Sequence, residues 1–202
     1  MHAHLATVAL EAVGKRLWGF KPNLMRHIVE QRGAFYALIW FVTNMPKYEY
    51  ILRVWGPIRT HLVSTTISTL NGCPYCTHGH AYAFQLHYLR QYGKLFALDE
   101  AAILQLHSLG EGEVLIQLEQ ALIEAGLAEE IPYLQRIIEL RHDVALSNTR
   151  EDGHLLHLMR MFAVLNECGI NGQPEIDAAH DPINKDAALR KRYAALRMEL
   201  KA

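Results

Sequence analysis

The sequence predicts an all-α fold, and three observations lead to this prediction. Apolar residues recur at helical spacing along most of the chain, beginning with Leu5, Val8 and Val13. No succession of alternating strands and no glycine-rich phosphate loop interrupts this pattern. The connections between the periodic segments are short, so we expect antiparallel neighbouring helices in one domain that comprises residues 1–202.

In the first part of the chain, the spacing of apolar residues predicts two long helices that are separated by the "GFKP" break. We expect the second helix to run from Asn23 to Asn44, because Pro46 lacks the N–H that a helix interior requires. A short segment, "KYEYILRVW", follows and ends at a Gly-Pro pair.

The stretch "LVSTTISTL" (Leu62 to Leu70) is rich in β-branched residues and would suit a strand. Its apolar residues do not alternate, however. They are separated by one, four and three positions, which places them on one face of a helix. We therefore predict a helix that ends at Asn71-Gly72.

Helical patterns continue to the end of the chain. A helix is expected from Pro74 to about Tyr92, and Asp99 is the predicted N-cap of the next one. Further helices are predicted in "EVLIQLEQALIEA", "PYLQRIIELRHDVAL" and "NTREDGHLLHLMRMFAVLNEC". A loop, "INGQPEIDAAHDP", precedes a final helix, "NKDAALRKRYAALRMELKA".

Composition excludes several classes of partner. The formal net charge of −1 argues against binding to nucleic acid or to an anionic membrane surface. The apolar run "GAFYALIWFV" is too short to span a bilayer, and the N-terminus does not resemble a signal peptide. Three cysteines cannot form a disulfide framework and suit a reducing compartment, so we expect a cytoplasmic protein.

The chemistry of the chain is concentrated in "NGCPYCTHGH", residues 71–80. Cys73 and Cys76 lie at the predicted start of a helix, where unpaired N–H groups and the helix dipole stabilise a thiolate below its free pKa of about 8.5. Pro74 suits an early helical position because its missing N–H would have had no partner. The two cysteines are about one turn apart, close enough for a disulfide in an irregular first turn.

Two histidines are placed to move a proton. His80 follows Cys76 by four residues and therefore shares its helical face, where it can deprotonate the thiol. His78 lies roughly opposite and is the expected bystander. If the chain folds back at Asn71-Gly72, His61 on the preceding helix is level with His80 within one turn and can orient it or relay its proton.

The pattern Cys73-x-x-Cys76-x-x-x-His80, preceded by "LVSTTISTLNG", resembles the AhpD-like alkylhydroperoxidases of the carboxymuconolactone decarboxylase superfamily. The upstream "GFKPNLMRHI" is similar to a G-F-x-P-N opening found in that family, and the resemblance is best over residues 19–92. It implies an all-α fold that assembles into trimers or hexamers. It also implies a hydroperoxide substrate and an external dithiol reductant, without a cofactor or metal.

The resemblance further implies a role for each residue of the motif. Cys76 attacks the peroxide and becomes a sulfenic acid, and Cys73 resolves it to a disulfide. The family usually carries a glutamate twelve residues before the first cysteine, where this chain has His61. A neutral imidazole can pass a proton but does not stabilise a protonated His80 as a carboxylate would, so we expect an altered pH dependence. The cysteine pair argues against lactone decarboxylation.

Other interpretations of these residues stay open. Cys73, Cys76 and His80, with His61 or His78, have enough ligand atoms for tetrahedral zinc. The alternative function is therefore a metal-binding or redox-sensing module without peroxidase activity, or a scaffold that has kept the fold and lost the chemistry. His61 could also be an ordinary packing or surface histidine.

Two further features are expected to be structural. Cys168 is interpreted as a small buried hydrophobe. An aromatic cluster is expected in the core or at a subunit interface, and it comprises Phe35, Tyr36, Trp40 and Phe41. Tyr75, between the two cysteines, is expected to line the approach to the sulfurs.

Overall fold

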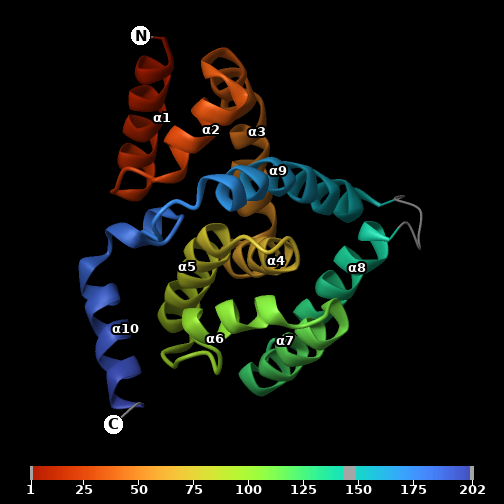
Figure 1. Cartoon of the computed structure of the whole chain (residues 1–202). Coiled ribbons are helices and arrows are strands. Elements are labelled where there is room, and N and C mark those ends of the chain that lie inside the picture. Colours follow the sequence, from red (N-terminus) through yellow and green to blue (C-terminus); the bar gives the residue numbers. More distant parts are fainter. Residues whose placement is uncertain (1, 143–148, 201–202) are drawn as a thin grey trace.

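The computed structural model describes residues 2–142 and 149–200, and in these ranges it contains helices and no strand, which confirms the all-α prediction (Figure 1). The α-helices are α1 His2–Trp18, α2 Leu24–Arg32, α3 Ala34–Trp55, α4 Pro57–Leu70, α5 Pro74–Tyr92, α6 Glu100–Gln105, α7 Glu111–Ala125, α8 Ile131–Arg141, α9 Arg150–Gly172 and α10 Ala187–Glu199. Short 3₁₀ turns cover Leu106–Ser108, Ala128–Glu130 and Pro182–Lys185. Among the described helices, none has the length and apolar character to cross a membrane.

Helices α4 and α5 lie in the middle of the molecule, between α9 on one side and α6 and α7 on the other (Figure 1). Nearly every residue of α4 is buried, including threonines and serines that would be exposed on a surface helix. The helix predicted for residues 62–70 is therefore confirmed. Its β-branched side chains reflect packing on all sides and not a strand.

The prediction of one helix from Asn23 to Asn44 that Pro46 ends is wrong. The chain breaks earlier, at Gly33, whose φ of 84° ends α2 and leads directly into α3. Helix α3 then continues through Pro46 to Trp55. Buried side chains on both sides of the proline hold it in the helix, and the side-chain amide of Asn44 donates to the Trp40 carbonyl at 2.8 Å.

Most other boundaries agree with the sequence. Asp99 caps α6 by accepting a hydrogen bond from the Ala102 N–H at 2.8 Å, as predicted. Helix α9 continues to Gly172, beyond the predicted end at the preceding Cys-Gly pair, and α10 begins after its cap, Asp186. Helix α8 matches "PYLQRIIELR", and the last part of that predicted helix lies outside the described residues.

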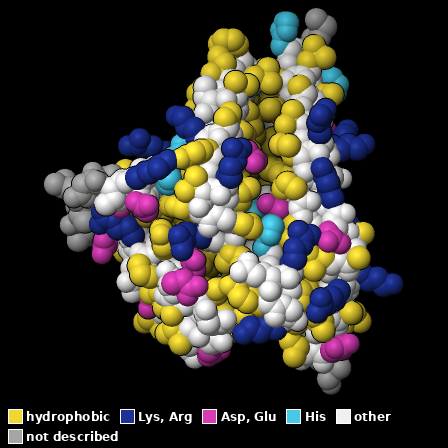
Figure 2. Space-filling view, turned by 180° about the vertical axis from the view of Figure 1, so that it is seen from behind, with side chains coloured by type: hydrophobic (Ala, Val, Ile, Leu, Met, Phe, Trp, Pro, Cys, Tyr) yellow, Lys and Arg dark blue, Asp and Glu magenta, His cyan; other side chains and the backbone are white. Residues whose placement is uncertain are grey.

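Helices α1 and α3 border an apolar furrow on one face of the molecule. In Figure 2, hydrophobic side chains line the space between the two columns that these helices form, and the furrow narrows toward the centre. Exposed apolar residues are common along both helices, for example Val13 and Val42. This surface adjoins the candidate site described below.

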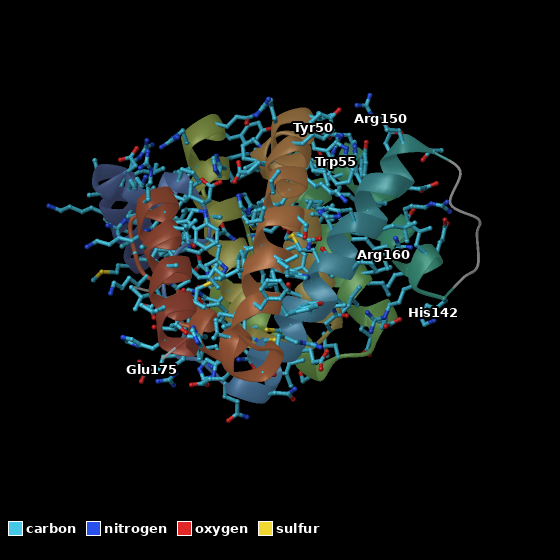
Figure 3. All side chains as sticks on the ribbon, turned by 90° about the horizontal axis from the view of Figure 1, so that it is seen from above. Tyr50, Trp55, His142, Arg150, Arg160 and Glu175 are labelled. Carbon is cyan, nitrogen blue, oxygen red and sulfur yellow. The ribbon has the colours of Figure 1, made fainter. Side chains whose placement is uncertain are left out.

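Helix α9 connects two distant parts of the molecule. Arg150 at its start contacts Tyr50 of α3, whereas Glu175, just past its end, lies beside α1 and α2 (Figure 3). The segment of residues 173–181, here called the returning loop, is fastened to the start of α2. The side chain of Asn23 donates to the Glu175 carbonyl at 3.0 Å, and its backbone N–H donates to Asp177 Oδ2 at 3.0 Å.

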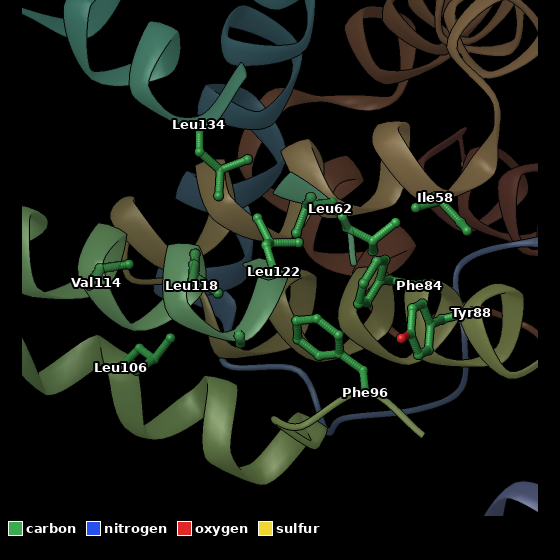
Figure 4. Close-up of a cluster of buried hydrophobic side chains, with 12 residues drawn as sticks. Ile58, Leu62, Phe84, Tyr88, Phe96, Leu106, Val114, Leu118, Leu122 and Leu134 are labelled. Carbon is green, nitrogen blue, oxygen red and sulfur yellow. The ribbon is translucent and has the colours of Figure 1, made fainter. Parts of the chain in front are cut away.

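An apolar cluster fills the space between the central helices and α6–α8 (Figure 4). Phe84 and Tyr88 of α5 pack there with Phe96, whose ring lies edge-on to Phe84 at 4.9 Å between centroids. Leu62 of α4 and Leu122 of α7 complete its centre. The cluster fixes the position of α4 and α5 on the side away from α9.

Candidate active site

The two cysteines lie at the turn between α4 and α5, as predicted. Cys73 is the N-cap of α5 with an extended backbone, and Pro74 follows in the first helical position. The Cys73 N–H donates back to the Ser68 carbonyl at 3.0 Å, and the Thr77 N–H donates to the Cys73 carbonyl at 3.0 Å. The turn therefore joins the end of α4 firmly to the first turn of α5.

Both thiols are free and buried, and they interact with each other. The Cys76 thiol hydrogen-bonds the Cys73 sulfur, which also faces the N–H groups of Tyr75 and Cys76, and these contacts lower the pKa of Cys73. The shared proton and burial raise the pKa of Cys76. The start of the helix thus stabilises a thiolate on Cys73, the cap residue, and not on the residue expected to attack.

Helix α9 makes room for the Cys73 sulfur at a glycine. A Cβ on Gly169 would lie 2.6 Å from Cys73 Sγ, closer than any van der Waals contact allows. The neighbouring Cys168 is fully buried in the same apolar cluster as Cys73 and Cys76, in agreement with the packing role predicted for it. The position of the Cys73 sulfur therefore depends on a close approach between α5 and α9.

His61 and His80 meet between α4 and α5. Their Nδ1 atoms are 3.1 Å apart, as expected from the fold-back at Asn71-Gly72. Both rings are buried, and His61 has no exposed surface, so it is not a surface histidine. His78 lies outside this contact and packs near Tyr82 at 6.1 Å between ring centroids.

A carboxylate reaches His61 from the returning loop. His61 Nε2 is 3.0 Å from Asp181 Oδ2, and His87 Nε2 is 3.0 Å from Asp181 Oδ1. The Ile183 N–H donates to Oδ1 at 2.7 Å. The sequence has no carboxylate at position 61, but tertiary structure places one immediately behind it.

Burial and hydrogen bonding set the charges of this network. Burial would raise the pKa of Asp181, but the hydrogen bonds and charges of His61 and His87 outweigh it and hold that pKa far below its usual range. Burial lowers the pKa of His61 despite the opposing contact with Asp181. Burial, and then the neighbouring His61 and His180, lower the pKa of His80 further. These directions favour an ionised Asp181 carboxylate beside neutral His61 and His80 rings at neutral pH.

These protonation states fix the tautomers of His61 and His80. The carboxylate of Asp181 accepts a hydrogen bond, so His61 carries its proton on Nε2 and presents a bare Nδ1. His61 Nδ1 then accepts from the Nδ1–H of His80. His80 Nε2 is consequently unprotonated, which is the form that a general base requires.

A second set of contacts in the returning loop surrounds Tyr75. Its hydroxyl donates to Asp177 Oδ2 at 2.6 Å, and His180 Nε2 is 3.1 Å from Asp177 Oδ1. The His180 N–H donates to the Gly79 carbonyl at 3.1 Å, which fastens the loop to α5. Burial and the adjacent Asp177 raise the pKa of Tyr75, so it stays protonated.

A small cavity of about 40 Å³ brings the reactive groups together. Cys76 and His80 line it, with Tyr75 and His180 from the contacts above, whereas Cys73 is not part of its lining. Tyr75 therefore lines the approach to the sulfurs, as predicted. The remaining walls are mainly apolar and come from α1, α2, α3 and α9.

The structure also groups possible metal ligands, but around histidines and not around sulfur. The ligand atoms of His61, His87 and Asp181 lie within 4.8 Å of one another. Among the described residues, neither Cys73 nor Cys76 belongs to such a group. The zinc site considered from the sequence, with both cysteines as ligands, has no support here.

Sequence reasoning identified the motif residues and missed their partners. Asp177, His180 and Asp181 all lie in the segment predicted as a loop, which has no periodicity to indicate which side chains point inward. The one available signal was the presence of three titratable residues within five positions. Their target could not be inferred, because His61 and Asp181 are separated by 120 positions.

In comparisons with known proteins, the chain matches no family model, no curated protein and no solved structure.

Proposed function

We propose that the protein is a thiol-dependent peroxidase that reduces hydroperoxides through a Cys73–Cys76 dithiol/disulfide cycle, as in the AhpD-like alkylhydroperoxidases. One observation carries this proposal. Cys76 and His80 border one cavity, and behind His80 the contacts continue through His61 to Asp181. This arrangement joins a nucleophile, a base and an orienting carboxylate.

The first step is the oxidation of Cys76. His80 Nε2 takes the thiol proton, and the Cys76 sulfur attacks the terminal oxygen of the hydroperoxide. The O–O bond breaks, and the alkoxide leaves as an alcohol with the proton from His80. Cys76 is then a sulfenic acid, oxidised by two electrons.

The second step forms the disulfide. Cys73 attacks the sulfenic sulfur, an S–S bond forms as the S–O bond breaks, and the leaving hydroxide takes the proton that the Cys73 thiol gave up and departs as water. The backbone N–H groups of Tyr75 and Cys76 contribute to the lowered pKa of Cys73, and they remain in place after Cys76 is oxidised, so they favour the thiolate that this step requires. An external dithiol then reduces the disulfide and restores both thiols.

Asp181 has the role that a glutamate at position 61 would have in the related family. A protonated His80 shares its Nδ1 proton with His61, whose other nitrogen faces the carboxylate. The negative charge of Asp181 therefore stabilises the His80 imidazolium through the intervening ring of His61, although the two charges are farther apart than in a direct contact.

We also propose that the protein is cytoplasmic and that it assembles as a trimer or hexamer. Three free buried cysteines are compatible with a reducing compartment. Of the predicted aromatic cluster, Phe35 is 79% exposed and Tyr36 is exposed on α3, whereas Trp40 is buried. The exposed pair is available for a subunit interface. Sedimentation of the full chain measures the oligomeric state, and a monomer would exclude this part of the proposal.

The decisive experiment is to add tert-butyl hydroperoxide to the reduced protein and follow the thiols by mass spectrometry. We expect a Cys73–Cys76 disulfide in the parent, no oxidation at this site in Cys76→Ser, and an accumulated sulfenic acid in Cys73→Ser. Cys168→Ser is the matched control and should behave like the parent. If no disulfide forms in the parent, or if Cys76→Ser consumes peroxide as fast, the proposal is wrong.

A second candidate function rests on the histidine–aspartate group. His61, His87 and Asp181 offer two imidazoles and a carboxylate, a donor set suited to a divalent transition metal. Metal analysis of freshly purified protein tests it. Stoichiometric metal that is lost in His87→Gln and kept in Cys76→Ser would favour a metal-binding module, and metal-free protein would exclude it.

A further inference from the structure

A second cleft lies between α3 and α9. Its volume is about 480 Å³, within the usual range for small-molecule sites. The lining of this α3–α9 cleft consists of Pro46, Lys47, Tyr50 and Ile51 from α3 and of Gly153, His154, His157 and Arg160 from α9. It shares no residue with the lining of the cavity at Cys76, so a ligand in this cleft does not depend on the proposed peroxidase function.

The charged side chains that line the α3–α9 cleft are of one sign. Lys47 of α3 and Arg160 of α9 are both exposed, and no carboxylate belongs to the lining. Neither cation forms an ion pair within the described part of the chain, whereas Arg59 and Arg136 are each paired with a carboxylate. Each helix therefore presents one uncompensated positive charge to the same space, which favours an anion.

Both cations act on His157, which lies in the wall of the cleft. Burial lowers the pKa of His157 most, the charge of Lys47 comes next, and Arg160 acts in the same direction, against a hydrogen bond to the Asn44 carbonyl. The fields of the two positive charges therefore overlap at this ring. An anion beside His157 would be attracted by both cations.

The two histidines of the cleft have hydrogen-bonding capacity that the protein itself does not use. His154 Nδ1 and His157 Nε2 are buried and make no hydrogen bond within the described residues. Unpaired buried nitrogens are uncommon in folded proteins. Because no hydrogen bond at these atoms fixes the rings, either ring can turn to present a nitrogen to the cleft and donate to an anion.

A fixed aromatic ring borders the cations. Arg150 of α9 contacts the hydroxyl of Tyr50 and packs over its ring at 5.8 Å from the centroid (Figure 3). The ring of His154 meets Tyr50 edge-on at 5.9 Å between centroids. Together with Pro46 and Ile51, Tyr50 gives the cleft an apolar wall. A ligand with an anionic end and a flat apolar part therefore matches the lining better than an inorganic ion does.

We propose that the α3–α9 cleft binds a small organic phosphate monoester, with its phosphate between Lys47 and Arg160 and its organic part against Tyr50. A phosphate monoester carries about 1.5 to 2 negative charges near neutral pH, which balances the two cations, whereas a carboxylate carries only one. Its three terminal oxygens can accept hydrogen bonds from both helices at once. The volume of the cleft leaves room for the organic part beside the phosphate.

Calorimetric titration of the full chain with phenyl phosphate, inorganic phosphate and benzoate tests the ligand class. We expect phenyl phosphate to bind with a Kd below about 1 mM. Inorganic phosphate lacks a group for the apolar wall and benzoate lacks the second charge, so each should bind at least about tenfold more weakly. Absence of phenyl phosphate binding would overturn the site. An equal affinity for benzoate would overturn the phosphate assignment, and an equal affinity for inorganic phosphate would overturn the monoester assignment.

Charge variants locate the phosphate. Lys47→Gln and Arg160→Gln each remove one cation from the cleft, and each should weaken phenyl phosphate binding at least about tenfold. Lys191→Gln makes the same change in net charge at an exposed position on α10 and should leave the affinity unchanged. Equal affinities in Lys47→Gln and Lys191→Gln would contradict binding between the two cations of the cleft.

A change of shape at constant charge is an independent test. A Cβ at Gly153 meets no atom within 4 Å, so Gly153→Leu should fold and place its side chain in the open space at the α9 wall of the cleft. We expect the affinity for phenyl phosphate to fall at least about tenfold, with unchanged helix content by circular dichroism. Parent-like binding by the folded Gly153→Leu protein would place the ligand outside the cleft and overturn the proposal.

Discussion

Two regions of the molecule are built on the same two helices, α4 and α5, but are held together by different kinds of interaction. Leu62 of α4 belongs to the apolar cluster, whereas the adjacent His61 belongs to the polar network that leads to Asp181. The cluster is held by non-directional burial, which depends on volume and area. The network depends on the position and protonation of individual atoms. We infer that changes in the cluster alter stability, and that changes in the network alter chemistry.

Truncation of the apolar cluster should have the largest effect. Phe84→Ala removes a buried ring from its centre, and we expect a loss of about 3–5 kcal/mol in the free energy of unfolding, measured by urea denaturation. The rate of thiol oxidation in the folded fraction should not change. A large fall in that rate at constant folded fraction would show that the two regions are not separable.

Loss of the carboxylate should affect chemistry more than stability. Asp181→Asn keeps the volume of the side chain but lets its amide donate to His61, which reverses the tautomers of His61 and His80. We expect Cys76 oxidation to slow about 10–100-fold near neutral pH. Asp186→Asn, an N-cap change five positions away and outside the network, should leave the rate unchanged. An unaltered rate in Asp181→Asn would remove the carboxylate from the mechanism.

The contact between α9 and Cys73 offers a change that affects both properties. Gly169→Ala would place a methyl group against Cys73 Sγ, so we expect about 1–3 kcal/mol of destabilisation and slower disulfide formation. Gly153→Ala on the same helix has no atom within 4 Å of the new Cβ and should be neutral or slightly stabilising. Thermal unfolding and the sulfenic acid lifetime measure the two effects. Equal stability and equal sulfenic acid lifetimes in both variants would contradict the close contact between Gly169 and the Cys73 sulfur.

The smallest expected effect is on pH dependence. Burial and the neighbouring histidines lower the folded-state pKa of His80 below its unfolded value of 6.5, so the unfolded chain binds more protons as the pH falls. Stability should therefore decline by about 1–2 kcal/mol per such histidine between about pH 7 and pH 5.

The variant His80→Gln should reduce this decline, which urea midpoints at several pH values would measure. His4→Gln, at an exposed position on α1, is the control and should leave the decline in stability unchanged. Asp181 acts in the same direction at lower pH. The hydrogen bonds from His61 and His87 outweigh burial and lower its pKa, so its contribution is present above its unfolded pKa and lost on acidification.

The sequence by itself determined the helical fold, the turn at Asn71-Gly72, the position of both cysteines at a helix start and the meeting of His61 with His80. These features depend on periodicity, capping and fold-back over a few turns, which neighbouring residues decide. Sequence reasoning failed at Pro46, because packing on both sides of the proline outweighs the missing N–H.

Tertiary structure alone decided two features. It brought Asp181 to His61 across 120 positions, and it placed the apolar furrow beside the cavity at Cys76. Each depends on which side chains of distant segments share a buried space. Local patterns carry no information on that choice, because it results from the packing of the whole chain.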